Sequence, residues 1–461
     1  HYPYVPHAQG FDEFIGFRTG HWMDYFDSVL ERNGKPFETK GYITDALTNE
    51  SIRFIESNIE GNTGSNPEHP FFLYLAYNAP HSPFQVPDRY FQPFKEAGLA
   101  DATAAVYGMV TNLDENVGRL LSRVDELGIA ESTVVVFLTD NGPNGQRYNA
   151  GLRGTKGSVY EGGVRVPFFA RWKGRFEAGK KVDTIAAHID VYPTLLEICG
   201  VAAPKGRPVD GCSIAPLLTG KVRDWPDRML FTHRETEREP DAMYPGTVRT
   251  QRFNLVNGKE LYDLSSDPGE QTDVAGKYPA KVNELREAYE NWFRDALGER
   301  GFSRFPIPVG YPEENPVTLA APQSYFSGGL KFHGGPGYAH DWISGWTSTE
   351  DQVYWDIDVV RGGKYEVGMK YLCPKEDVGS TVSIGDGNST IEFTVDKATP
   401  MSRTAALSID PTDRYEIMKW AVVTPGTLNL VKGRTKLTVK ALKKTGETVM
   451  DLKEVILKRL E

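Results

Sequence analysis

Residues 132–167 constrain the fold of this chain more than any other stretch. The stretch opens with an apolar run at residues 134–138, typical of a strand buried on both faces. The run ends in the sequence D-N-G-P, and ligands of open α/β sheets bind at the carboxyl ends of strands. We therefore interpret Asp140 and Asn141 as metal ligands, whose hard oxygen atoms favour calcium or magnesium over zinc. The alternative is an ordinary Asp-Asn-Gly turn.

A glycine-rich segment follows and holds Lys156 between Gly154 and Gly157. Glycine lets a ligand approach the backbone closely, and a lysine there offers a cationic donor to an anion. The alternative interpretation is a solvated loop lysine.

The whole stretch resembles the second signature region of the sulfatases, within the alkaline-phosphatase-like superfamily. The resemblance implies that Asp140 and Asn141 bind calcium and that Lys156 contacts the sulfate. The pattern G-x-K-G-x-x-Y-E-G-G-x-R-x-P is completed by Glu161, Gly162, Gly163, Arg165 and Pro167.

Composition narrows the classes of partner. The 461 residues suffice for about three domains, and a net charge of -10 without any basic block argues against nucleic acid. No apolar run approaches the roughly 18 residues of a membrane span. Of the three cysteines, Cys199 and Cys212 could pair, but the count is too low for a disulfide framework.

The start of the chain bears on the nucleophile. It begins at His1 without methionine, which suggests a processed or truncated start. The G-F-D-x-F-x-G-F string at residues 10–17 is similar to one that follows a catalytic G-K-W-H motif in sulfatases. No cysteine here opens the C-x-P-S-R type motif that carries the family's formylglycine. The resemblance implies that the nucleophile and two metal-binding aspartates lie upstream. We expect the chain alone to be inactive, and to expose a sheet edge and apolar surface.

A second apolar run at residues 71–77 predicts another buried strand, followed by A-P-H at His81. Apolar residues at helical spacing over 101–127 predict a helix, which completes a right-handed strand–helix–strand unit. His81 and the Asp140–Asn141 pair would then share one cleft. The resemblance implies that His81 contacts the sulfate and the leaving-group oxygen; the alternative is a structural turn residue. We interpret His188, in an H-x-D-x-x-P-T string, as structural.

The rest of the chain changes character. Short strands at 229–232, 247–256 and 261–264, an Asn257-Gly258 hairpin turn and a closing helix match the small sulfatase subdomain. Alternating residues 353–359 and 365–371 predict a hairpin in a β-sandwich. The sandwich weakly resembles carbohydrate-binding modules, and its candidate sugar-stacking aromatics, which more commonly fill a core, are Tyr338, Trp342 and Trp346.

The predicted fold class is α/β: an alkaline-phosphatase-like mixed sheet sandwiched by helices, a small antiparallel α+β subdomain and a C-terminal β-sandwich. The predicted domains are 1–225 (catalytic, lacking its amino-terminal part), 226–300 (C-terminal subdomain), 301–315 (linker) and 316–461 (sandwich). We expect a calcium-dependent sulfatase acting on sulfated small molecules or glycans, periplasmic or secreted by resemblance, with no membrane partner. The alternatives are a phosphodiesterase or phosphonate hydrolase of the same superfamily, and a non-catalytic glycan-binding remnant. Candidate specificity residues are Arg147, Tyr148 and Asn149.

Overall fold

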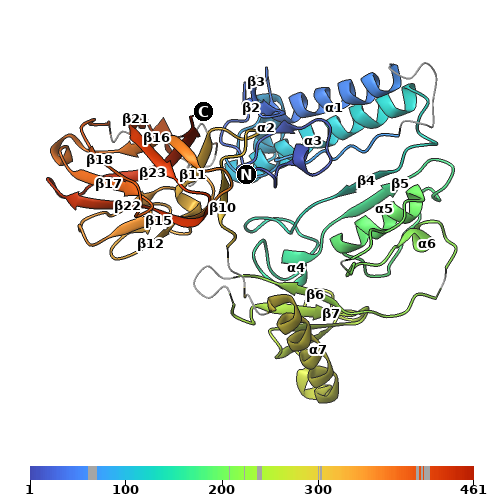
Figure 1. Cartoon of the computed structure of the whole chain (residues 1–461). Coiled ribbons are helices and arrows are strands. Elements are labelled where there is room, and N and C mark those ends of the chain that lie inside the picture. The colour runs from blue at the N-terminus through green and yellow to red at the C-terminus, as the bar shows by residue number, and fades with distance from the viewer. Residues whose placement is uncertain are drawn as a thin grey trace. The chain divides into compact units, whose positions relative to one another are not determined.

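The computed structural model in Figure 1 describes residues 1–60, 70–206, 208–222, 224–235, 241–298, 301, 304–400, 404–405, 409 and 416–460. The chain divides into two compact units. The first unit comprises His1–Ser122 and Arg304–Glu461, and the second comprises Arg123–Ser303. In the part of the chain that the structure describes, no helix has the length and apolar character needed to cross a membrane.

The amino-terminal part of the first unit packs helices against a small antiparallel sheet. The predicted helix at 101–127 is confirmed as α3, and its residues Val106 and Met109 are buried as the apolar stripe requires. Tyr25 and Ile43 are fully buried in the same core. The sheet has the order β1-β2-β3. The elements are η1 (Pro6–Ala8), β1 (Ile15–Gly16), β2 (Val29–Arg32), β3 (Lys35–Glu38), α1 (Ile43–Glu60), α2 (Asp88–Glu96) and α3 (Asp101–Glu126).

The strand predicted at residues 71–77 is wrong. The segment is not assigned as a strand and belongs to no sheet of the described residues. Its burial alternates, with Phe72 62% and Tyr74 72% exposed. An apolar run supplies side chains for a buried strand, but a strand also needs a partner for its backbone N–H and C=O groups. The predicted strand–helix–strand unit is therefore not formed.

In the second unit, β4 (Val135–Leu138) pairs antiparallel with β5 (Phe168–Arg171). All four residues of β4 are only half-buried, so the prediction of a strand buried on both faces is wrong. Among the described residues β4 and β5 form a sheet of only two strands, so β4 is not an interior strand of a larger sheet with layers packed on both faces. The helices here are α4 (Glu161–Val164), η2 (His188–Asp190), α5 (Val191–Cys199) and α6 (Ala215–Leu218).

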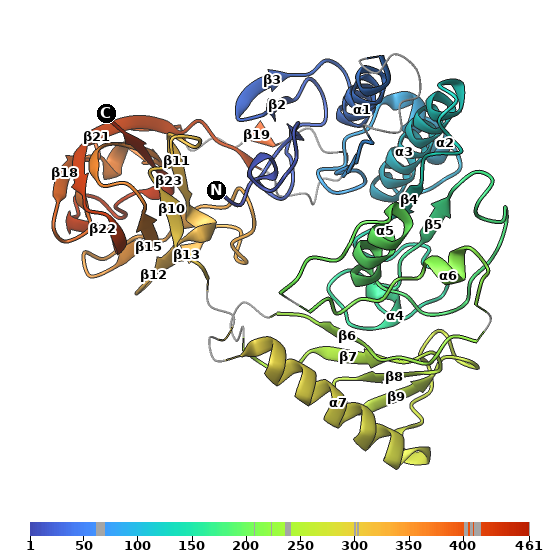
Figure 2. The ribbon, with the colours of Figure 1, turned by 45° about the vertical axis from the view of Figure 1, so that its right-hand side comes forward.

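The second unit also contains a four-stranded antiparallel sheet of order β6-β7-β8-β9, with α7 along one face (Figure 2). The strand predicted at 247–256 is two strands joined by a turn. The predicted hairpin turn is confirmed, since Asn257 (φ 51°) and Gly258 (φ 66°) both take the left-handed conformation that a type I′ turn requires. The elements are β6 (Leu230–His233), β7 (Gly246–Arg249), β8 (Phe253–Val256), β9 (Glu260–Asp263), η3 (Ala275–Lys277) and α7 (Pro279–Leu297).

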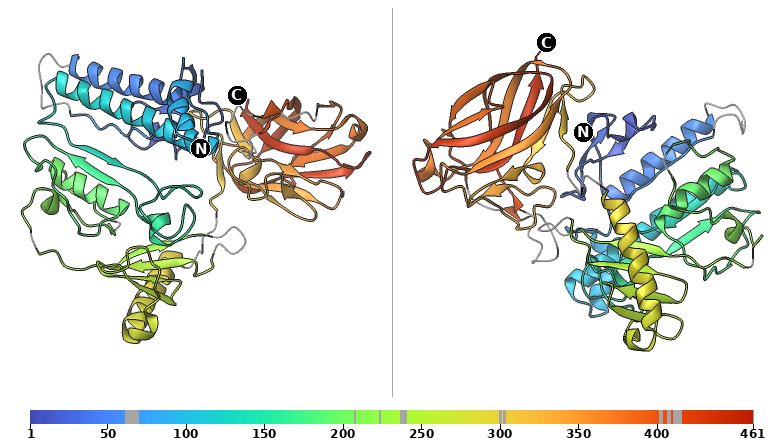
Figure 3. Two further views of the ribbon diagram at one scale, coloured as in Figure 1. Left: turned by 180° about the vertical axis from the view of Figure 1, so that it is seen from behind. Right: turned by 60° about the horizontal axis from the view of Figure 1, so that its bottom comes forward.

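The carboxyl-terminal part of the first unit is a β-sandwich (Figure 3). One sheet has the order β10-β15-β22-β17-β18, with β12 on β15, and the other has the order β13-β14-β23-β16-β21, with β11 on β23. Its elements are β10 (Ile307–Val309), β11 (Val317–Ala320), η4 (Ala321–Gln323), β12 (Tyr325–Phe326), β13 (Lys331–Phe332), β14 (Ile343–Ser344), β15 (Gln352–Val359), β16 (Gly363–Leu372), η5 (Lys375–Asp377), β17 (Thr381–Gly385), β18 (Thr390–Thr394), β21 (Ala421–Leu430), β22 (Gly433–Lys443) and β23 (Asp451–Arg459). A separate short pair is β19 (Thr404–Ala405) with β20 (Glu416–Ile417).

The predicted hairpin of residues 353–359 and 365–371 is wrong, although both alternations are real. β15 pairs with β22, whereas β16 pairs with β21 and β23, so the two strands lie in opposite sheets. Each has one buried face because both faces point into the shared core. β10, inside the segment predicted as a linker, pairs in parallel with β15.

The sandwich buries two of the three aromatics considered for sugar stacking. Trp342 is 6% exposed and Trp346 is fully buried, whereas Tyr338 is 63% exposed. Trp342 stacks against His333 at 4.2 Å between ring centroids and donates its indole N–H to Asp451. Core packing is thus the role of both tryptophans.

Candidate functional site

The turn after β4 carries the two predicted metal ligands of the second unit. The Asp140 side chain is exposed, and its Oδ1 accepts a hydrogen bond from the Asn141 amide at 2.9 Å. Asn141 donates its Nδ2 to the Gly142 carbonyl at 2.9 Å, which turns its Oδ1 away from that carbonyl. A carboxylate oxygen and an amide oxygen are donors that suit a hard cation.

This turn is locked to the glycine-rich segment by close backbone contacts. The Gly142 amide donates to the Gly163 carbonyl at 2.9 Å, and a Cβ at residue 142 would lie only 1.9 Å from the Gly162 carbonyl oxygen. The Lys156 amide donates to the Pro143 carbonyl at 2.9 Å, and the Lys156 side chain is exposed. The structure therefore brings Asp140, Asn141 and Lys156 into one folded loop cluster.

The segment with the H-x-D-x-x-P-T sequence, which begins at His188, contacts this loop cluster through the backbone of Thr139. His188 Nε2 lies 2.8 Å from the Thr139 carbonyl, which can only accept, so Nε2 is the donor. The fully buried Asp190 accepts from the amides of Ala187 (2.8 Å) and Cys212 (2.9 Å) and pairs with Arg228 at 2.9 Å. These contacts are those of a structural motif, and His188 acts on the residue that precedes Asp140.

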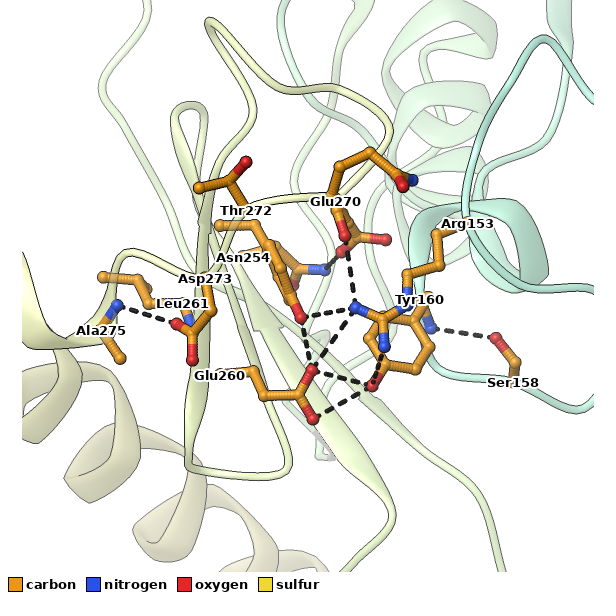
Figure 4. Close-up of polar contacts among 12 residues, drawn as sticks. Arg153, Ser158, Tyr160, Asn254, Glu260, Leu261, Glu270, Thr272, Asp273 and Ala275 are labelled. Carbon is orange, nitrogen blue, oxygen red and sulfur yellow. Dashed lines mark hydrogen bonds and ion pairs between the residues drawn. The ribbon is translucent and has the colours of Figure 1, made fainter.

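A second polar network ties the segment that carries Lys156 to the four-stranded sheet (Figure 4). The Arg153 guanidinium lies 4.0 Å from the Tyr160 ring centroid and donates to the Tyr262 hydroxyl at 2.6 Å. Tyr160 and Tyr262 both donate to the Glu260 carboxylate. The Arg153 side chain also donates to the Glu270 carbonyl at 3.2 Å.

Glu270 is the buried member of this network. Its carboxylate accepts from the Glu161 amide at 2.8 Å and from the Asn254 side chain at 2.6 Å, and it is fully buried. Burial raises the pKa of Glu270 to about 7, and the two hydrogen bonds oppose this shift. Glu270 ends the sequence L-Y-D-L-S-S-D-P-G-E at residues 261–270, so this sequence anchors the segment that carries Lys156.

His81 belongs to the first unit, where a short turn fixes its ring. Its amide donates to the Asn78 carbonyl at 2.9 Å, and Tyr25 donates its hydroxyl to the His81 carbonyl at 2.6 Å. The ring Nδ1 lies 2.7 Å from the Ser82 carbonyl, so Nδ1 is the donor and Nε2 is the atom left to face a ligand.

The four predicted site residues are thus divided between the two units. Asp140, Asn141 and Lys156 lie in the second and His81 in the first, so their convergence on one cleft stays a prediction. Over the described ranges, no group of three or more His, Cys, Asp or Glu side chains is arranged to hold a metal ion. The Asp140–Asn141 pair would hold calcium only together with further oxygen donors.

The structure describes the surroundings of two candidate specificity residues and of the cysteines. Asn149 donates to the carbonyls of Leu152 (2.7 Å) and Gly154 (3.2 Å), so it shapes the loop, while Tyr148 is 83% exposed. All three cysteines are free, so Cys199 and Cys212 do not pair.

Two histidines near His81 were missed by the sequence analysis. The ring of His21 stacks on that of His81 at 5.2 Å between centroids, and His340 of the sandwich meets His21 edge-on at 5.1 Å. No motif in the sequence marks either residue, because their significance depends on contacts between segments far apart in the chain.

Two family models match most of the chain before the sandwich. Residues 2–201 match the family model described as Sulfatase, and residues 155–293 match the model described as N-sulphoglucosamine sulphohydrolase, C-terminal.

Individual relatives agree with these matches. The chain is 33% identical to an uncharacterized sulfatase, YdeN, of Escherichia coli over 61% of this chain and 56% of the relative. It is 28% identical to an arylsulfatase of Clostridium perfringens over 59% of this chain and 63% of the relative. The chain thus spans between about half and two thirds of the length of these relatives.

A solved structure confirms the fold class. The crystal structure of Ps i-CgsB in complex with k-i-k-neocarrahexaose superposes with a TM-score of 0.57 at 28% identity, over 65% of this chain and 70% of the other. The predicted α/β class is confirmed by this likeness.

Proposed function

We propose that this chain, which belongs to the sulfatase family over residues 2–293, provides the calcium ligands, a sulfate-binding lysine and a proton donor of a sulfate ester hydrolase. The observation that carries the proposal is the hydrogen bond from the Lys156 amide to the Pro143 carbonyl. This bond joins the segment of Lys156, the predicted sulfate-binding residue, to the turn that carries the predicted calcium ligands Asp140 and Asn141. An anion beside a bound cation and an ammonium group is what sulfate recognition requires.

Asp140 and Asn141 would hold the cation. Calcium, when bound, supplies a Lewis acid that neutralises negative charge on sulfate oxygens. The exposed Asp140 carboxylate and the oriented Asn141 amide fit such an ion by the chemistry of their donors. Lys156 adds a cationic donor to a sulfate oxygen.

His81 would complete the reaction at the leaving group. When the bond between sulfur and the ester oxygen breaks, that oxygen gains negative charge and needs a proton. With Nδ1 donating to the Ser82 carbonyl, a His81 ring in its imidazolium form would donate that proton from Nε2 and become neutral. The nucleophile of the family is a formylglycine, which none of Cys199, Cys212 and Cys373 can provide within a C-x-P-S-R type motif. We therefore place the formylglycine outside these 461 residues.

The substrate class is an aryl or carbohydrate sulfate. Among relatives, the Clostridium perfringens protein is named an arylsulfatase, and Ps i-CgsB was crystallised with an oligosaccharide. The proposal includes a periplasmic or secreted location, by analogy with the family.

Hydrolysis of 4-nitrophenyl sulfate and 4-nitrophenyl phosphate tests the proposal, with protein that includes the formylglycine segment. We expect calcium-dependent turnover of the sulfate and little turnover of the phosphate. Lys156→Gln should lower kcat/KM by about 100-fold, the typical loss on removing one group that stabilises developing charge. The matched control is Lys173→Gln, an exposed lysine of the same unit, which should leave the rate unchanged.

Faster hydrolysis of the phosphate ester would point instead to a phosphodiesterase-like enzyme and contradict the proposal. Equal loss of activity in Lys156→Gln and Lys173→Gln would contradict the role of Lys156.

A further inference from the structure

Three imidazole rings from distant segments of the first unit lie in contact. His81 belongs to the turn at residues 78–83, His21 to the amino-terminal segment, and His340 to the sandwich loop between β13 and β14. The rings of His21 and His81 are nearly parallel, at 18°, whereas His340 meets His21 at 74°. His21 therefore connects the sandwich to the candidate proton donor.

His340 is held in place at both its ring and its backbone. Its Nε2 donates to the His21 carbonyl at 3.0 Å. Its φ of 72° lies in the left-handed region, which is unfavourable for most residues other than glycine. Such strain persists only where surrounding contacts impose it, and it is concentrated at functional sites.

Lys453 of β23 holds the backbone at and after His340. Its ammonium group donates to the His340 carbonyl and, at 3.3 Å, to the Asp341 carbonyl. It also lies 5.8 Å and 5.5 Å from the ring centroids of Trp342 and Trp420. The loop that carries His340 is thus clamped to the sandwich core.

The surroundings of His340 favour its uncharged form. Burial lowers the pKa of His340, the hydrogen bond to the His21 carbonyl opposes this shift, and the neighbouring Lys453 charge adds to it. Burial also lowers the pKa of Lys453, to about 8. A neutral His340 can donate through Nε2 to the His21 carbonyl without placing a second positive charge next to the ring pair.

We propose that His340 is a positioning residue for His81, acting through His21, so that the β-sandwich forms part of the acid–base site. This inference rests on the proposed function in taking His81 as the proton donor. The ring plane of His81 is set by its stack on His21, and the Nε2 direction is set by the contact of Nδ1 with the Ser82 carbonyl. Losing His340 removes the ring contact and the hydrogen bond that hold His21.

Nuclear magnetic resonance of the 461-residue chain tests the contact without any need for activity. The chain has nine histidines, so selective labelling of histidine gives a small set of ring signals that single His→Asn variants assign. His340→Asn should shift the His81 ring signal, since asparagine tolerates a positive φ and keeps the loop folded while removing the ring. Tyr338→Ala, an exposed residue of the same loop, should leave the signal in place.

The leaving-group dependence of hydrolysis tests the consequence in protein that includes the formylglycine segment. Phenyl sulfate has a poorer leaving group than 4-nitrophenyl sulfate and depends more on proton donation. His340→Asn should lower kcat for phenyl sulfate by about 10- to 100-fold, a fraction of what general acid catalysis contributes, and by much less for 4-nitrophenyl sulfate. A purely structural role would lower both rates equally.

An unmoved His81 signal in His340→Asn would overturn the inference, whatever the activity. A shifted signal with equal losses on both esters would also overturn it, because His81 would be in contact with the sandwich without being positioned for proton transfer. If unmodified protein hydrolyses neither ester, the proposed function fails, and an unmoved or shifted His81 signal still decides whether His340 positions that ring.

Discussion

Gly142→Ala should disrupt the loop cluster without removing the side chain of any predicted ligand. Gly142 is buried and has no positive φ, so alanine is compatible with its backbone conformation and the effect is purely steric. The added Cβ would lie 1.9 Å from the Gly162 carbonyl oxygen, and real contacts of this kind are not found below 3.0 Å. Both partners are backbone, so the turn must move away from Gly162 by about 1 Å.

The magnitude follows from two contributions. Movement of this size breaks the hydrogen bond from the Gly142 amide to the Gly163 carbonyl, which is worth about 1 kcal/mol. Overpacking of a filled site costs about 1–3 kcal/mol more. A local destabilisation of about 2–4 kcal/mol raises the opening equilibrium by about 30- to 1,000-fold.

Amide hydrogen exchange measured by mass spectrometry is the appropriate assay, because it reports on the loop cluster locally. Peptides containing the amides of Gly142, Lys156 and Gly162 should exchange faster by that factor in Gly142→Ala. The control is Gly118→Ala in α3, where no atom lies within 4 Å of the added Cβ and the helix should gain about 0.5–1 kcal/mol. Unchanged exchange in Gly142→Ala would refute the close packing of the two segments.

Two further predictions concern buried charge. Because burial raises the pKa of Glu270 to about 7, the stability that its protonated form contributes is full below the unfolded pKa near 4.5 and is lost as the pH rises through 7. Urea titrations should show the unfolding free energy of the wild type falling by up to about 3 kcal/mol between pH 4.5 and 8, relative to that of Glu270→Gln. A difference between the two proteins that stays constant with pH would contradict this. Arg228→Met leaves the buried Asp190 carboxylate without its ion pair and should lower the unfolding free energy by about 3 kcal/mol in the same assay. The control Arg171→Met removes an exposed ion pair and should lower it by less than about 1 kcal/mol. Equal losses would show that the buried pair contributes no more than the exposed one.

Local patterns in the sequence predicted local structure well. The apolar stripe of α3, the closing helix α7 and the Asn257-Gly258 turn were all predicted, because each depends on spacing or backbone preference within a few residues. The signature region placed Asp140, Asn141 and Lys156 in one loop cluster for the same reason: the contacts that join them lie within about 20 residues.

Pairing between distant segments could not be predicted. Residues 71–77 and β4 have similar apolar runs, yet only β4 has a partner strand. β15 and β16 are consecutive strands, and buried and partly exposed residues alternate along both. The same alternation is expected for two strands of one hairpin and for strands of two sheets that face each other, so the sequence could not distinguish these arrangements. The contact of His21 and His340 near His81 depends on three segments meeting, for which the sequence holds no local signal.

Anomalous scattering from a crystal of the protein soaked with calcium and sulfate would locate both ions. We predict a calcium ion with the Asp140 and Asn141 side-chain oxygens at about 2.3–2.6 Å, and a sulfate contacted by Lys156 Nζ and His81 Nε2. A calcium ion bound elsewhere, or a sulfate contacted by neither Lys156 nor His81, would contradict it.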